Sequence, residues 1–307
     1  MPALPEHFTH PLDRAALEKL RSVPLFPSCV KAFMKLLPER LLHGLNMANK
    51  VRLGPQQLPE IYRHLPPLCA AFGIAEPEFY LEMNPFPNSY TYGDKRVFVT
   101  LTSGLVECLE EDELHSVVAH ECGHIVCQHV LYHTMAQMLI HLGATVFGPL
   151  AALSKPVQLG LLYWVRRSEL SADRAAAVVM HGPRPVIHSL VRLAGGPKAI
   201  TEGINLKLYA QQAEAYDKLL DSRWDQFLQG LVIMNQSHPY LAVRAREITG
   251  WCKTKEFRDV MLELDGLKSA RRCTKCAQPL APARKSCTFC GAKVTNGPKT
   301  KRTRRTG

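Results

Sequence analysis

The alternation of hydrophobic and polar positions divides this 307-residue chain into helical stretches around one short β-rich segment. Residues 1–75 contain helical pieces separated by prolines, one opening near Leu12 and another spanning Leu58–Phe72, and we expect them to form a helical brace. From residue 78 onward, two runs, Glu78–Met83 and Arg96–Leu101, have the residue types and alternation of strands. They predict a small sheet, which either is purely structural or leaves one edge free to pair with an extended peptide.

Two further helices are predicted after the sheet, one opening at Ser103 and one near Asp112, where four consecutive acids favour a helix N-terminus. Residues 134–154 then carry no formal charge, and residues 156–165 form a shorter uncharged stretch. The first approaches the length of a membrane span. A single crossing would separate the two halves of the candidate site described below, so we predict a helical hairpin, buried in the fold or dipping into a membrane surface.

Glycines and prolines punctuate residues 182–197, which separate further helices. Amphipathic patterns predict helices over Ile204–Leu220 and Trp224–Met234, and one long helix over Tyr240–Leu264. Their leucine, isoleucine and tryptophan positions are most simply assigned to the core. The pattern therefore predicts a predominantly helical chain with a small sheet.

The apolar run from Leu114 to Val130 contains the HExxH pentapeptide, with His120, Glu121 and His124. In a helix the two histidines are four residues apart on one face, spaced to hold one metal ion between their imidazoles. Glu121 points to the adjoining face, where it can hold and deprotonate a metal-bound water. Because so short a pattern also arises by chance, the site needs support from elsewhere in the chain.

A catalytic zinc needs three protein ligands and one open position. The metzincin spacing would place glycine at position 127 and histidine at position 130, where this chain has Cys127 and Val130. The other common solution takes a glutamate from a second helix. Glu169 and Asp173 share a helix face, so Glu169 can bind the metal while Asp173 accepts a hydrogen bond from a ligand histidine. Alone, the two acids would be better explained as partners of nearby arginines, and the pentapeptide is what favours the ligand interpretation.

The order of these motifs resembles the gluzincin metallopeptidases of the HtpX and CAAX-prenyl-endopeptidase family. HECGHIVCQH from residue 120 is followed by ELSADRAA from residue 169, and then by Ser237-His238-Pro239 and Arg244. Residues 88–93 and 99–105 are similar to the strand region of that family. The resemblance covers roughly residues 75–250. Unlike the integral membrane members, this sequence lacks several strong spans, which argues against a prenylated or membrane-embedded substrate.

The resemblance implies an α+β, predominantly helical fold, with a zincin-type catalytic domain and a small β-sheet before the HExxH helix. It implies a catalytic zinc held by His120, His124 and Glu169. Glu121 would be the general base that takes a proton from the attacking water and delivers it to the leaving amine.

Other residues match family positions around that centre. His238 matches a histidine suited to stabilising the oxyanion, or it caps the open zinc position in a latent state. Arg244 matches the arginine that orders the ligand glutamate, and His129 is a candidate to contact the ligands. The other nearby histidines, His115, His133 and His141, are expected in the core or at the surface.

The formal net charge of +11 arises in the C-terminal tail, because residues 267–307 hold 12 of the 38 lysines and arginines and no acid. The body is close to neutral and gives no reason to expect a polyanionic substrate. The first 20 residues lack a continuous apolar segment, so we expect no signal peptide. The ten cysteines do not form a secreted disulfide pattern, so we expect a cytoplasmic location, with or without membrane association.

Four cysteines near the C-terminus, Cys273, Cys276, Cys287 and Cys290, have the CxxC-x10-CxxC spacing of a closed structural zinc site. They predict a small zinc ribbon whose stability comes from its metal. The ribbon can recruit a partner protein, present the basic tail to nucleic acid or acidic lipid, or gate the protease. Nucleic acid is the less favoured partner, because Phe289 is the one aromatic residue between these cysteines.

The sequence therefore predicts four regions: a helical N-terminal brace (1–75), a zinc metallopeptidase domain (76–265), a zinc ribbon (270–293) and a basic, disordered tail (294–307). The predicted function is a zinc-dependent endopeptidase, with one catalytic and one structural Zn2+, that hydrolyses extended or unfolded protein segments. Residues 134–165 are the candidate for peripheral membrane contact. The alternative is a catalytically silent, zinc-dependent binding or chaperone-like module that recruits partners through its ribbon.

Overall fold

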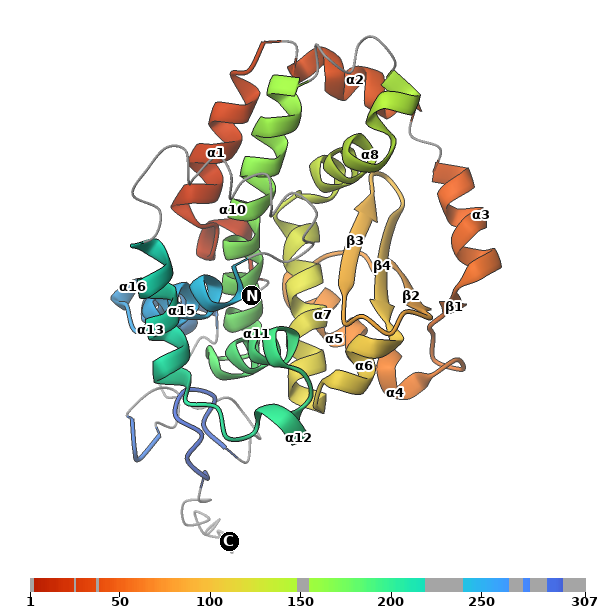
Figure 1. The fold of residues 1–307 in the computed structure, drawn as a ribbon. Coiled ribbons are helices and arrows are strands. Elements are labelled where there is room, and N and C mark those ends of the chain that lie inside the picture. Colours follow the sequence, from red (N-terminus) through yellow and green to blue (C-terminus); the bar gives the residue numbers. More distant parts are fainter. Residues whose placement is uncertain are drawn as a thin grey trace, which may run out of the picture.

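The computed structural model describes residues 3–24, 26–36, 39–147, 155–218, 240–264, 273–276 and 286–294. The fold is predominantly helical with one small mixed sheet, as the sequence predicted (Figure 1). The first elements are η1 (Pro5–His7), α1 (Pro11–Arg21), α2 (Phe26–Leu36), α3 (Glu39–Asn49), β1 (Val51–Arg52), α4 (Pro59–Tyr62) and α5 (Leu65–Phe72). The N-terminal segment is thus largely helical but also supplies a strand that the sequence did not indicate.

The sheet has the order β1-β2-β4-β3, with β2 (Glu78–Glu82), β3 (Ser89–Gly93) and β4 (Val97–Thr102). Strands β2 and β4 pair in parallel, whereas β1 and β3 are antiparallel to their neighbours. The two predicted strand runs correspond to β2 and β4, but β3 was not separately predicted. It forms the sheet edge that faces helix α7 (Figure 1).

Helix α7 (Glu111–Val126) follows the short helix α6 (Ser103–Cys108) and begins one residue before the expected Asp112. The backbone N–H of Glu110 donates to the Glu113 carboxylate at 2.9 Å, and this bond closes the first turn. The buried middle of α7 packs against α10 (Lys155–Val179). A Cβ on Gly123 would lie 2.9 Å from Cβ of Ala175, so glycine allows the two helices to approach closely.

Helices α8 (Val130–Phe147) and α10 correspond to the predicted hairpin, and residues 148–154 between them lie outside the described residues. Over the part of the chain that the structure describes, no helix is both long and apolar enough to cross a membrane. Helix α1 lies along α10 (Figure 1), and Leu20 shares a buried cluster with Trp164.

The C-terminal half contains α11 (Arg184–Gly195), α12 (Lys198–Thr201), α13 (Leu206–Asp217), α15 (Leu241–Trp251) and α16 (Lys255–Leu264). The prediction of one long helix over Tyr240–Leu264 was wrong, because the chain turns between α15 and α16. The Thr254 side chain accepts from the backbone N–H of Phe257 at 3.3 Å and caps α16. The Trp251 and Phe257 rings then meet 4.9 Å apart across the turn. The helix predicted over 224–234 lies outside the described residues.

Candidate metal centre

Helices α7 and α10 bring His120, His124 and Glu169 together in the interior of the protein. Their side chains are buried, and one ligand atom from each lies within 4.8 Å of the others. Nε2 of His120 is 3.1 Å from Nε2 of His124, and these atoms are 3.5 and 3.3 Å from the two carboxylate oxygens of Glu169. Two imidazoles and one carboxylate fit the donor set of a catalytic zinc. That these residues bind zinc stays a prediction.

Glu121 is also buried, and edge strand β3 holds both of its carboxylate oxygens. Ser89 Oγ donates to Oε1 and Thr91 Oγ1 donates to Oε2, each at 2.6 Å. The two hydroxyls are two residues apart on β3 and therefore point to one face of the strand. Sequence reasoning missed both residues, although the alternation of serine and threonine with tyrosine over residues 89–92 is a signal for them.

Asp173, one turn after Glu169 on α10, accepts from Nδ1 of His120 at 3.0 Å. Arg244 from α15 forms two hydrogen bonds to Asp173, at 2.8 and 2.7 Å, and its third nitrogen lies 2.8 Å from Glu169. Three helices thus meet at this buried charge network. The sequence predicted that Asp173 and Arg244 support the metal ligands. The structure brings both residues into contact with His120 or Glu169, and their supporting role stays a prediction.

The charges in this network shift two pKa values in opposite directions. Burial by itself would raise the pKa of Asp173, but the charge and hydrogen bonds of Arg244 together with the hydrogen bond from His120 outweigh burial and lower it to about 2. Burial by itself would lower the pKa of His120, but hydrogen bonds to Asp173 and Glu169 raise it to about 9. An ionised Asp173 can only accept, so Nδ1 of His120 carries a hydrogen and Nε2 is the nitrogen that faces Glu169.

His124 has its own partners on the other side of the site. Its Nδ1 lies 3.1 Å from Nδ1 of His129, and Nε2 of His129 lies 3.1 Å from Oδ2 of Asp13 on α1. The His133 ring is 4.5 Å from the His124 ring, and Nε2 of His133 contacts Ser168 Oγ at 2.7 Å. His129 contacts a predicted ligand as expected, whereas no sequence signal pointed to Asp13.

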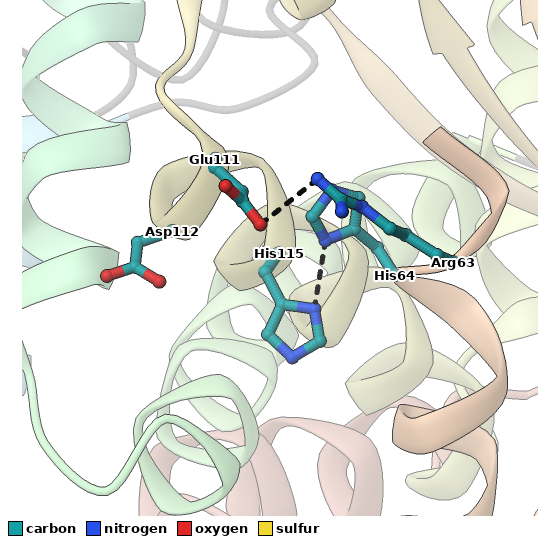
Figure 2. Close-up of a pocket in the computed structure, with 5 residues that line it drawn as sticks. All are labelled: Arg63, His64, Glu111, Asp112 and His115. Carbon is teal, nitrogen blue, oxygen red and sulfur yellow. Dashed lines mark hydrogen bonds and ion pairs between the residues drawn. The ribbon is translucent and has the colours of Figure 1, made fainter. Parts of the chain in front are cut away.

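The remaining predicted histidines lie elsewhere. His238 lies outside the described residues, as does the side chain of His141. His115 lines a pocket of about 240 Å³ near the first turn of α7, where its Nδ1 is 3.2 Å from Nδ1 of His64 (Figure 2). In the same pocket Glu111 pairs with Arg63 at 3.1 Å. This pocket was not predicted, and its lining residues are separate from the HExxH segment.

The four C-terminal cysteines also come together, with one sulfur from each within 4.8 Å of the others. They fit a closed, four-thiolate zinc site and are compatible with the predicted ribbon. The knuckle at residues 287–290 contacts the turn after α10: the Thr288 hydroxyl donates to the His181 carbonyl, and the backbone N–H of Arg184 donates to the Thr288 carbonyl at 3.1 Å. The Phe289 ring lies 5.7 Å from the Phe257 ring. Residues 295–307 of the basic tail lie outside the described residues.

Comparisons with known proteins agree with this arrangement. Residues 55–252 match the model of peptidase family M48. The chain is 32% identical over 260 residues to the plastoglobule-localized metallopeptidase 48, chloroplastic, of Arabidopsis thaliana, an alignment that covers 83% of this chain and 75% of that protein. It is 28% identical over 156 residues to a protease HtpX homolog of Syntrophobacter fumaroxidans, covering 49% of this chain and 53% of the relative. No solved structure matches.

Proposed function

The chain belongs to peptidase family M48 and is a metallopeptidase, and from this premise we propose that it is a zinc endopeptidase cleaving extended or unfolded protein segments. Peptidases of this family are zinc-dependent. The observation that carries the proposal is the buried His120, His124 and Glu169 triad beside a buried Glu121. The alternative of a catalytically silent binding module is not favoured by the family membership.

His120, His124 and Glu169 hold the zinc in this proposal. When bound, zinc supplies a Lewis acid that polarises the scissile carbonyl. Arg244 and Asp173 support it, because Arg244 touches Glu169 while Asp173 sets the tautomer of His120.

Glu121 acts as the general base. It takes a proton from the attacking water and delivers it to the nitrogen of the leaving amine. The hydroxyls of Ser89 and Thr91 hold its two oxygens, so the carboxylate is oriented before the substrate arrives. His238 remains the proposed donor to the oxyanion, or the cap of the open zinc position.

An extended substrate is favoured by the position of β3. This strand pairs with β4 on one side and forms an edge of the sheet. A peptide that pairs with the other side of β3 would lie beside the strand that holds Glu121. Backbone pairing requires no particular side chain, so unfolded segments of varied sequence would bind.

The test replaces Glu121 by glutamine. Glu121→Gln should retain zinc and fold while losing cleavage of a denatured protein substrate, because the amide cannot accept the proton. Glu111→Gln is the matched control, since it makes the same change at an exposed position on the same helix. Unchanged proteolysis by the Glu121→Gln protein would refute the proposal.

For location we propose the cytoplasm, with membrane-surface contact through residues 134–165, although the Arabidopsis relative is named as plastoglobule-localized and chloroplastic. We further propose that the ribbon recruits a protein partner. Co-sedimentation of the purified chain with anionic phospholipid vesicles tests the membrane contact. Failure to bind at low salt would contradict it.

A further inference from the structure

Asp13 is a buried carboxylate in the N-terminal helix α1, outside the segment that matches the family model. It accepts three hydrogen bonds from residues far along the chain. The donors are Nε2 of His129 at 3.1 Å, Nε1 of Trp164 at 2.8 Å and Oγ of Ser171 at 2.5 Å. Of these three hydrogen bonds, the one from His129 connects Asp13 to the metal centre, because His129 also contacts His124.

The direction of the hydrogens follows from the chemistry of these groups. A carboxylate can only accept, so Nε2 of His129 carries a hydrogen that it donates to Asp13. Burial raises the pKa of Asp13, but the hydrogen bonds from His129, Ser171 and Trp164 lower it overall. Asp13 is therefore ionised at neutral pH.

The position of the hydrogen on His129 determines the tautomer of His124. A neutral imidazole with hydrogen on Nε2 has a lone pair on Nδ1, and this atom lies 3.1 Å from Nδ1 of His124. His124 must then carry its hydrogen on Nδ1. Its Nε2 is left with a free lone pair, and that atom is the one 3.3 Å from Glu169.

A competing explanation is a second metal ion, because ligand atoms of His124, His129 and His133 also lie within 4.8 Å of one another. The hydrogen bonds argue against it. Both nitrogens of His129 have partners in Asp13 and His124, and Nε2 of His133 contacts Ser168. A metal among the three rings would have to replace these bonds.

We propose that Asp13 is a positioning residue of the zinc site, which acts through His129 to hold His124 in the tautomer whose Nε2 can bind the metal. The inference rests on the proposed ligand role of His124. It makes α1 a functional part of the peptidase. Asp13 would serve His124 through an intermediate ring as Asp173 serves His120 directly.

The experiment measures zinc affinity of the full chain by competition with a chromophoric chelator, together with thermal unfolding. Asp13→Asn has nearly the same shape, but its amide can donate to His129 and so permit the other tautomer. We expect a loss of about 10–100-fold in affinity at the site that His124→Ala abolishes. Asp259→Asn on α16 makes the same chemical change at an exposed ion pair with Lys255, and should keep near wild-type affinity.

A double-mutant cycle tests whether Asp13 acts on His124 through His129. His129→Ala should lower affinity by itself, and adding Asp13→Asn to it should have no further effect, because the link is already broken. If Asp13→Asn does not fold, His129→Ala tests the same link from its other end. Additive effects, or lower thermal stability of Asp13→Asn without loss of affinity, would overturn the proposal.

Failure of this inference is distinguishable from failure of the proposed function. If His124→Ala removes no zinc from the wild-type complement, the ligand assignment itself is wrong, and the inference falls with it. If His124→Ala removes zinc but Asp13→Asn binds it as tightly as wild type, only the positioning role is wrong. Three zinc ions per chain, one of them lost in His133→Ala, would establish the second-metal explanation instead.

Discussion

The two candidate zinc sites of this chain differ in what holds their ligands in place. His120, His124 and Glu169 stand on two long helices that pack closely in the core, and each contacts a further buried side chain. The four cysteines stand on two short segments whose sulfur atoms face one another. We therefore expect protein packing to preserve the first geometry and the metal itself to maintain the second.

This difference in what maintains each site agrees with the role that its donor set suits, which is reaction for the first site and structure for the second. Three ligands leave a position open for reaction, so the surrounding protein must keep them in place. Four thiolates complete the coordination of zinc and leave no position for a substrate. Loss of metal should therefore abolish activity at the first site and unfold the second.

The largest effect is expected from Cys287→Ser. A structural zinc contributes about 10–16 kcal/mol of apparent binding free energy, which this variant forfeits in large part. Metal analysis should show one zinc fewer, and hydrogen exchange should rise in residues 286–294 while α7 and α10 stay protected. Ser286→Ala, at the neighbouring exposed position, is the control. Loss of both zinc ions would show that the two sites are not independent.

The second prediction tests how much the buried charge network stabilises the first candidate site. Arg244→Met leaves the buried carboxylates of Asp173 and Glu169 without their cation, and should lower the free energy of unfolding by about 3–5 kcal/mol. Urea denaturation measures it. Arg246→Met on the same helix removes a partly exposed pair with Glu247 and should cost less than about 1 kcal/mol. Equal effects would mean that the buried network has no special role.

A smaller effect is expected where α7 and α10 approach most closely. Gly123→Ala places a methyl group 2.9 Å from Cβ of Ala175 and should cost about 1–3 kcal/mol of stability. In Gly250→Ala the added carbon meets no atom within 4 Å, and this helical position should gain about 0.4–1 kcal/mol. Thermal unfolding of both variants checks the difference in sign. A stabilised Gly123→Ala protein would refute the close-packing argument.

The smallest effect concerns the orientation of Glu121. Ser89→Ala or Thr91→Val removes one of its two hydrogen-bond donors, and each should lower kcat by about tenfold with unchanged zinc content. Tyr92→Phe is the control, because its hydroxyl bonds to Asn46 rather than Glu121. Wild-type kcat in both variants would show that Glu121 needs no support from β3.

Some parts of this architecture could be predicted because they depend on local spacing. The i, i+4 pairs on α7 and α10, the acidic start of α7 and the paired cysteine motifs each follow from a few neighbouring residues. The presence of a small sheet and the mainly helical fold follow from periodicity. The order of the motifs along the chain then connected Glu169 to the pentapeptide.

Other parts could not be predicted because they depend on contacts between distant segments. Asp13 lies in an ordinary amphipathic helix, and nothing in its neighbourhood indicates that it meets His129 and Ser171. The turn after Trp251 was missed because apolar periodicity continues through it, although Thr254 is a good helix cap. The alternation of residue types did not indicate strand β3 because turn residues flank it, although the family resemblance placed residues 88–93 in a strand region.

Helix α10 presents five side chains to the site and its surroundings, namely Trp164, Ser168, Glu169, Ser171 and Asp173. All five depend on one continuous helical register. Inserting a single residue after Trp164 would rotate the last four by about 100° relative to the tryptophan and move them all at once. Insertions and deletions between residues 164 and 173 should therefore be removed by selection in functional descendants of this protein. Substitutions of the exposed Tyr163 on the same helix should be tolerated.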